Sequence, residues 1–334
     1  MLVLASLLDA CSSGAATSSS AGTPGASASP LADASTPTPA ATPTPVPTPA
    51  GMAAPVIVQV ENLSDARPQS GLSFADVVYE YATEGGITRF SAIFFTPPPG
   101  AVGPVRSARL VSILLTQLWG ALLVYSGGSN YTNARLSASH IPRFNESSAG
   151  SALYRLGRRR APHNLYADGG RLASLLSRAS LARVAYMLWA RQAAAAGGRP
   201  VAGFSVPLSA TERPGYSWRP DLGGWVRTEA GTGTFIDADT GRPVVAPTVV
   251  VVQVPSRINP ADVEDVSGAR GLEFTLQGSW GAQVFTGGME FDATLTQPGA
   301  GPPQLTLANG APAPIAPGLV WICLDPQGAP ATLR

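Results

Sequence analysis

The chain has 334 residues, a formal net charge of +1 and only 13% charged residues. This near-neutral balance excludes a protein that binds nucleic acid or a membrane surface through a broad basic face. All 22 basic residues are Arg, and the two Cys are too few for a disulfide framework.

The first eleven residues have the pattern of a lipoprotein signal. Met1–Leu8 is a short apolar segment, and Asp9, Ala10 and Cys11 follow it. A Leu three positions before a Cys, with a small residue directly before it, resembles the bacterial lipobox, whose Cys is lipidated. The basic residues that open a signal peptide are missing, so we expect the translation start to lie upstream. The alternative is a Cys that follows an apolar start by chance.

Residues 12–54 consist almost entirely of Ser, Thr, Ala, Gly and Pro. With so few large apolar groups, this segment has little to offset the entropy lost on ordering, which predicts a disordered Pro/Thr-rich tether. Its Pro-rich half favours an extended polyproline II conformation of about 3.1 Å per residue. The tether would hold a folded domain up to ~100 Å from the bilayer.

Residues 55–200 are predicted to form an α/β (α+β) domain. Short runs rich in β-branched and aromatic residues indicate strands, and two longer runs carry apolar residues at helical spacing. The expected strands are 56–62, 87–95 and 121–129, and 75–86 is expected to be a strand followed by a turn at its Gly pair. The expected helices are 107–120 and 171–196. Gly120 is the expected C-cap of the first helix.

Residues 204–334 have a different pattern. Short apolar runs alternate with Gly-, Pro- and Asp-rich turns, and no segment has a convincing helical period. This pattern predicts a mostly antiparallel β domain, either a sandwich or a partly closed barrel. No later apolar stretch is long enough to span a membrane.

Several motifs resemble a known family. ARPQSGL (66–72), EGGITRF (84–90) and GPVRSAR (103–109) are followed by VYSGGS (124–129) and APHNLYAD (161–168). In this order and spacing they resemble the YerB-like lipoproteins, bacterial envelope proteins that pair two domains of unknown function. The resemblance is strong over about 55–170 and looser near the C-terminus. It implies a lipid-anchored extracytoplasmic protein at the outer face of the cytoplasmic membrane, and it supplies no reaction.

Four arginines lie in or beside these loops: Arg67, Arg89, Arg106 and Arg109. Arg suits bidentate recognition of a carboxylate or phosphate. If the helix 107–120 begins in GPVRSAR, Ser107 is its N-cap. The free backbone N–H groups of the first helical turn would then contribute to an anion site. The alternative is that these arginines form internal ion pairs with Asp76, Glu80 and Glu84.

The candidate ligand-binding residues share a position in polar loops at the ends of predicted strands. They are Arg67, Gln69, Ser70, Glu80, Glu84, Gly85, Gly86, Thr88, Arg89, Arg106, Ser107, Arg109, Gly127, Gly128, Ser129, His163 and Asn164. The Gly127–Gly128 pair could present backbone N–H groups to an anion. Ser129 could serve as a nucleophile, but the G-x-S-x-G motif of α/β-hydrolases is absent.

Two residues are candidates for acid–base catalysis, Glu84 and His163. On one strand, Glu80 and Glu84 would lie roughly 13 Å apart, too far to act together. His163 follows three arginines, whose charge favours a neutral imidazole. It is therefore either a general base or a loop residue that forms hydrogen bonds.

Other polar or reactive residues have simpler interpretations. Cys323 lies in an apolar strand and is expected to be buried, and the run from Asp237 to Gly241 is expected to be a hairpin turn rather than a Ca²⁺ loop. No spacing indicates a metal site, and no motif indicates a cofactor.

Three functional hypotheses remain. The first is a binding module for an anionic glycan, a peptide or an envelope protein. The second is an envelope hydrolase or transferase that uses Glu84 and His163. The third is a structural partner of another envelope protein.

Overall fold

The computed structural model describes residues 51–181, 184–186, 197–229, 233–326 and 328–334. Cys11, the predicted signal and nearly all of the predicted tether lie outside these residues. Of the helices in this described part, none is long and apolar enough to cross a membrane.

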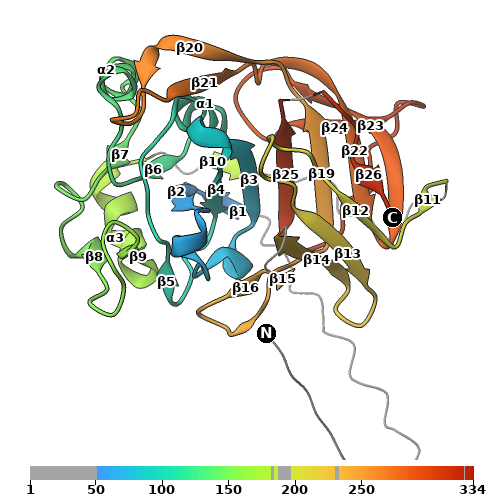
Figure 1. Cartoon of the computed structure of the whole chain (residues 1–334), viewed down its shortest axis with the longest axis horizontal. Helices are drawn as coiled ribbons and strands as arrows, with labels where there is room; N and C mark the ends of the chain where they lie inside the picture. Colours follow the sequence, from blue (N-terminus) through green and yellow to red (C-terminus); the bar gives the residue numbers. More distant parts are fainter. Residues whose placement is uncertain (1–50, 182–183, 187–196, 230–232, 327) are drawn as a thin grey trace, which may run out of the picture. The chain divides into compact units, whose positions relative to one another are not determined.

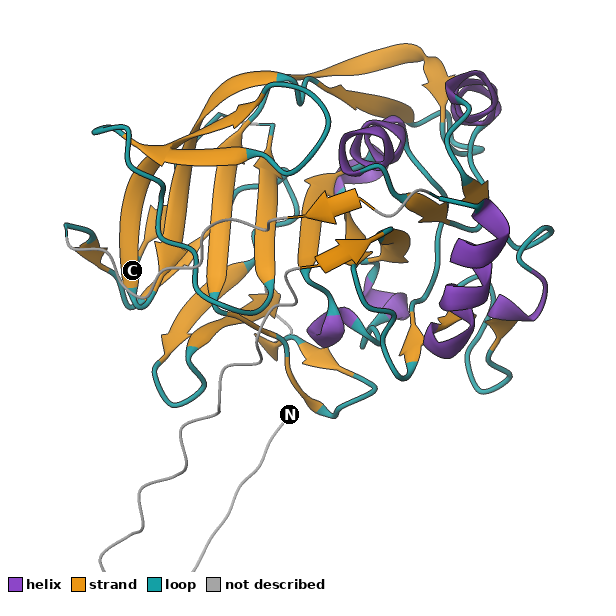
Figure 2. Ribbon diagram, turned by 180° about the vertical axis from the view of Figure 1, so that it is seen from behind, coloured by secondary structure: helices purple, strands orange, loops and turns teal. Residues whose placement is uncertain are grey.

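One eleven-stranded sheet contains strands from both halves of the chain (Figure 1), and Figure 2 shows its strands from the opposite side. In order of pairing, the strands are β11 (Arg199–Pro200), β23 (Met289–Gln297), β22 (Gly278–Thr286), β19 (Thr248–Gln253), β25 (Val320–Asp325), β3 (Val77–Ala82), β4 (Thr88–Phe94), β2 (Val56–Glu61), β6 (Leu122–Val124) and β7 (Arg143–Phe144), and β24 (Gln304–Leu307) pairs with β23. The halves meet where β25 lies parallel to β3, with Ile322 opposite Tyr79.

The centre of this sheet is buried on both faces. Every residue of β2, β3, β4 and β25 is buried. Ile57, Tyr79 and Ile322 belong to the core on one face, and Val58 and Trp321 belong to the core on the other. Near-continuous apolar runs are typical of strands covered on both sides, which explains why these strands were predictable.

Three α-helices occur in the described residues: α1 (Leu110–Trp119), α2 (Asn130–Ser139) and α3 (Gly169–Ala179). Gly120 caps α1 with a φ of 56°, as predicted. The N-cap prediction is wrong, because the cap residue is Arg109 and its N–H donates to Ser112 Oγ at 3.0 Å. Ser107 lies two residues earlier, and its carbonyl accepts a hydrogen bond from Arg89.

The predicted helix 171–196 is too long. The helix α3 ends at Ala179, and Ser180 adopts a φ of 50°. Val184–Tyr186 forms strand β10, which pairs with β1 (Gly51–Ala53). A β-branched and an aromatic residue suit that pairing better than a helix. Residues 187–196 lie outside the described part of the chain.

The remaining strands form small sheets. A six-stranded sheet contains β12 (Gly203–Ser205), β13 (Gly215–Arg219), β14 (Gly224–Glu229), β15 (Gly233–Thr234), β18 (Val245–Ala246) and β26 (Thr332–Leu333). A three-stranded sheet consists of β5 (Ala101–Val102), β8 (Leu153–Arg155) and β9 (Leu165–Asp168). There are also two hairpins. One pairs β16 (Ile236–Asp237) with β17 (Arg242–Pro243), and the other pairs β20 (Ser256–Val263) with β21 (Arg270–Phe274). The chain thus combines a mixed α/β sheet with antiparallel β sheets in its C-terminal part, where Asp237 begins the predicted turn.

A buried ion cluster joins the six-stranded sheet to the large sheet. Arg227 of β14 donates to Glu80 Oε1 of β3 at 2.6 Å and also bonds Glu229. Trp321 Nε1 donates to Glu80 Oε2 at 2.9 Å. The guanidinium of Arg227 lies 4.6 Å from the ring centroid of Phe235. Arg227 is therefore held in one geometry, because its buried guanidinium bonds two carboxylates and packs against an aromatic ring.

We expect Arg227→Met to lower the free energy of unfolding by about 3–5 kcal/mol, because Glu80 would stay buried without a cation and Glu229 would keep only Arg67. Urea unfolding of the full chain measures this change. Arg219→Gln is the control, since Arg219 forms an exposed pair with Asp221 and its loss should change stability little. Equal effects of the two substitutions would contradict the structural role of the cluster.

Candidate functional site

The three predicted polar loops converge at one edge of the large sheet, where β2, β3 and β6 end and β4 begins. Ser70 and Gly103 exchange two backbone hydrogen bonds of 2.8 and 3.1 Å, which join the ARPQSGL and GPVRSAR loops. Arg89 Nη1 donates to the Ser107 carbonyl at 2.9 Å and joins GPVRSAR to β4. Carboxyl ends of parallel strands are the usual position of sites in α/β sheets.

The first cluster at this edge surrounds Glu61, the last residue of β2. The Glu61 carboxylate is fully buried, with Arg106 Nε at 3.0 Å and His163 Nδ1 at 2.9 Å. Gln69 Nε2 donates to the Glu61 carbonyl at 2.8 Å. The side chains of Arg106 and His163 are 25% and 17% exposed. Glu61 is not among the predicted site residues, although a Glu at the end of an apolar strand was an available signal.

The second cluster surrounds Glu84. Arg109 donates through Nε to Glu84 Oε2 at 2.7 Å and through Nη2 to Glu84 Oε1, and Arg89 Nη2 lies 3.9 Å from the same carboxylate. Burial opposes ionisation of Glu84, but hydrogen bonds from Arg109 and the charges of both arginines outweigh it and hold its pKa below 4.5. Burial and the charge of Arg109 lower the pKa of Arg89 to about 10.

Glu84 lies in the turn predicted to follow the strand, and not on a strand shared with Glu80. The strand β3 ends at Ala82, and Glu84–Gly86 forms a 3-10 turn in which Gly85 and Gly86 have φ values of 69° and 78°. Left-handed backbone at two consecutive residues ends a strand and favours Gly. Glu80, inside the strand, belongs to the buried cluster with Arg227 instead.

The hairpin β20–β21 adds two carboxylates that the sequence analysis missed. Ser129 Oγ donates to Asp262, and Glu264 Oε2 lies 3.2 Å from Arg109 Nη1. Ser129 is also the N-cap of α2, accepting the Thr132 N–H at 3.0 Å. Burial raises the pKa of Glu264 to about 7, and Arg109 opposes this rise. The start of α2 and Arg109 therefore already have anionic partners inside the protein.

Arg67 lies apart from both clusters. Its Nη2 donates to the Asn62 carbonyl at 2.9 Å and lies 3.4 Å from Glu229 and 3.6 Å from Glu212. Burial and the charge of Glu229 raise the pKa of Glu212. Arg67 and Gln69 line a cavity of about 490 Å³ together with Phe235 and Ile236.

Each of the four arginines thus has a carboxylate within 4.0 Å. Glu84 is one of the acidic partners named in the internal ion-pair alternative. The other carboxylates that contact these arginines are Glu61, Glu229, Glu212 and Glu264, which the alternative did not name. Asp76 and Glu80, which it did name, contact none of the four arginines. The Asp76 carboxylate instead accepts the Phe95 N–H at 2.8 Å.

The other predicted residues mainly hold loops in place. Thr88 Oγ1 donates to Glu80 Oε1 at 3.0 Å, and Asn164 Oδ1 accepts from Arg155 at 2.7 Å. The carbonyls of Gly127 and Gly128 accept from the Ala108 N–H and from Asn133, both at 2.8 Å, and the Gly86 carbonyl accepts from Thr211 Oγ1. Cys323 is buried as predicted, and burial raises the pKa of its thiol. In the part of the chain that the structure describes, no three His, Cys, Asp or Glu side chains are grouped to hold a metal ion.

Glu264 should make stability depend on pH. Its pKa rises from 4.5 to about 7 on folding, so the folded protein holds this proton more tightly than the unfolded chain does. Protonation of Glu264 therefore adds to the free energy of unfolding. This added stability is complete below pH 4.5 and is lost as the pH rises to about 7.

Glu264→Gln should remove this part of the pH profile. Urea unfolding at pH values from 4.5 to 7 gives the free energy of unfolding of wild type and of Glu264→Gln. In the difference between the two proteins, the contributions of all other titrating groups cancel. Parallel profiles for the two proteins would contradict the raised pKa.

Comparison with known proteins identifies the chain's relatives. Residues 42–182 match the "Protein of unknown function (DUF3048) N-terminal domain", and residues 204–322 match the corresponding C-terminal domain. "Putative lipoprotein YerB" of Bacillus subtilis (strain 168) is 42% identical over 113 residues, which span only 34% of each chain. The crystal structure of YerB protein from Bacillus subtilis aligns over 85% of this chain and 94% of its own length, with a TM-score of 0.72 and 27% identity. The chain therefore belongs to the DUF3048 family and is homologous to YerB.

Proposed function

We propose that this protein is a lipid-anchored binding module that captures an anionic ligand of the cell envelope at the edge formed by Arg106 and His163. The ligand class is an anionic glycan, a peptide or an acidic surface of an envelope protein. The anchor would be Cys11 at the outer face of the cytoplasmic membrane. The lipobox pattern and the homology to a protein named as a lipoprotein support this location.

One observation supports the binding proposal above the others: arginines outnumber carboxylates in the loops around Glu61. Arg106 and His163 both contact this single carboxylate. His163 follows Arg158, Arg159 and Arg160 in one loop, and the structure gives none of these three an ion pair with another described residue. Arg159 binds the Ala66 and Pro68 carbonyls, which keeps this basic loop against the ARPQSGL loop.

Arg106 suits ligand capture better than Arg89 or Arg109. Arg89 is 2% exposed and Arg109 is 8% exposed, and both contact Glu84. Arg109 also contacts Glu264. Arg106 is a quarter exposed and shares Glu61 with His163. An incoming carboxylate or phosphate can therefore reach Arg106 without displacing a buried ion pair.

A second candidate function is an envelope hydrolase or transferase. The contact between His163 Nδ1 and Glu61 Oε2 favours it, because a carboxylate at one ring nitrogen orients the other for proton transfer. Glu84 supports this alternative less well, since its lowered pKa opposes a role as a proton donor at neutral pH. His163 and Glu84 also contact different partners.

Titration of the full chain with soluble muropeptides, with oligomers of glycerol phosphate and with inorganic phosphate tests the binding proposal. We expect at least one anionic probe to bind, and Arg106→Gln to weaken it roughly tenfold or more through the loss of a charge-assisted hydrogen bond. Arg213→Gln is the control, because Arg213 is exposed and forms no ion pair with Glu61 or another described carboxylate.

Two outcomes would contradict the proposal. Equal affinities in Arg106→Gln and Arg213→Gln would remove Arg106 from the site. Turnover of a muropeptide by wild type, but not by His163→Gln, would favour the enzyme instead. Thermal unfolding of each variant shows whether a loss of binding reflects a loss of folding.

A further inference from the structure

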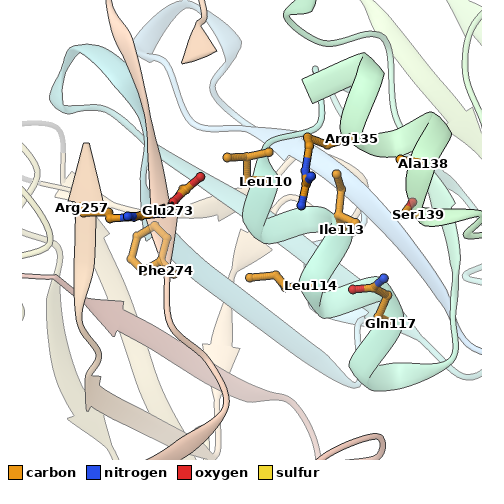
Figure 3. Close-up of a pocket in the computed structure, with 10 residues that line it drawn as sticks. All are labelled: Leu110, Ile113, Leu114, Gln117, Arg135, Ala138, Ser139, Arg257, Glu273 and Phe274. Carbon is orange, nitrogen blue, oxygen red and sulfur yellow. Dashed lines mark hydrogen bonds and ion pairs between the residues drawn. The ribbon is translucent and has the colours of Figure 1, made fainter. Parts of the chain in front are cut away.

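A groove away from this edge lies between the first two helices and the hairpin β20–β21. Its volume is about 520 Å³, and Figure 3 shows its walls: α1 and α2 on one side, and the hairpin on the other. Its lining residues are Leu110, Ile113, Leu114, Gln117, Arg135, Ala138, Ser139, Arg257, Glu273 and Phe274. None of these belongs to the residues proposed above to bind the envelope ligand.

The floor of the groove is apolar. Leu110, Ile113 and Leu114 lie on consecutive turns of α1 and face the groove, and Phe274 of β21 lies opposite them (Figure 3). Leu114 is half-buried, whereas the rest of α1 is buried except at Gln117. Leu110, Ile113 and Phe274 are themselves buried, so Leu114 is the floor side chain most open to solvent. A concave groove with an apolar floor and a few polar groups at its rim is typical of a ligand site.

The rim of the groove carries a surplus positive charge. Arg257 donates to Glu273 Oε2 at 2.7 Å, so these two charges compensate each other. Arg135 extends from α2 toward α1 (Figure 3), and within the described residues it forms no hydrogen bond or ion pair. Two arginines against one glutamate leave one positive charge beside an apolar floor, which is complementary to an anion with an apolar body.

We propose that this groove binds an anionic amphiphile with an alkyl chain. The chain lies on Leu110, Ile113, Leu114 and Phe274, and its carboxylate or phosphate group binds Arg135. Apart from the charged residues, only Gln117 and Ser139 offer polar side chains to the ligand, and Ser139 Oγ already donates to the Leu136 carbonyl. Along the apolar floor a peptide backbone would find few hydrogen-bond partners, whereas an alkyl chain needs none.

Dodecanoate, dodecyl phosphate and uncharged dodecanol test the proposal. Each is titrated calorimetrically into the full chain, below the concentration at which it forms micelles. We expect both anions to bind, and Arg135→Gln to weaken them roughly tenfold while dodecanol binding stays the same. Leu114→Gln should weaken all three probes, because it removes part of the apolar floor at little cost to the helix.

Two control variants separate this groove from other effects. Arg213→Gln removes an exposed arginine outside the groove, and Arg106→Gln alters the edge near Glu61. Both should leave dodecanoate binding unchanged. Thermal unfolding midpoints equal to that of wild type show that the groove variants remain folded.

Several results would overturn the proposal. They are no binding of either anion, equal dodecanoate affinity in Arg135→Gln and wild type, or equal affinity of wild type for dodecanoate and dodecanol. Tighter binding of an apolar peptide with a free C-terminal carboxylate would overturn the choice of an alkyl chain. Comparison of dodecanoate with dodecyl phosphate distinguishes the two acid groups.

Discussion

The parallel pairing of β25 with β3 is the contact on which the rest of the structure depends. Through it, the C-terminal half of the chain supplies the strand that completes the large sheet beside the polar loops of the N-terminal half. Trp321 of β25 then donates to Glu80, and Glu80 in turn holds Arg227. One backbone pairing therefore positions a buried charge that neither half could satisfy alone.

The pairing of β25 with β3 also brings the hairpin β20–β21 next to α1 and α2. There Glu264 contacts Arg109 and Asp262 contacts Ser129. Positive groups of the N-terminal half are thus divided into two sets. Those under the hairpin are neutralised inside the protein, and those near Glu61 remain partly exposed. This division, rather than the number of arginines, decides where an external anion has access.

Local patterns predicted the local features. Apolar runs and turn residues are enough to predict the buried strands β2 and β4, the end of α1 at Gly120 and the burial of Cys323. The missed features depend on residues far apart in sequence. Glu264 reaches Arg109 only because a hairpin crosses two helices, and Val184–Tyr186 becomes a strand only because Gly51–Ala53 offers a partner. Periodicity within one segment contains no information on such partners.

The position of β25 in the sheet also has a consequence for synthesis of the chain. Glu80 and its partner Trp321 are 241 residues apart, so β25 is synthesised long after β3. Until β25 has left the ribosome, one edge of β3 has no neighbour, and such an edge can pair with other chains. Contacts of this sequence separation also slow folding. A nascent chain of this protein would therefore depend on protection from aggregation until β25 is available.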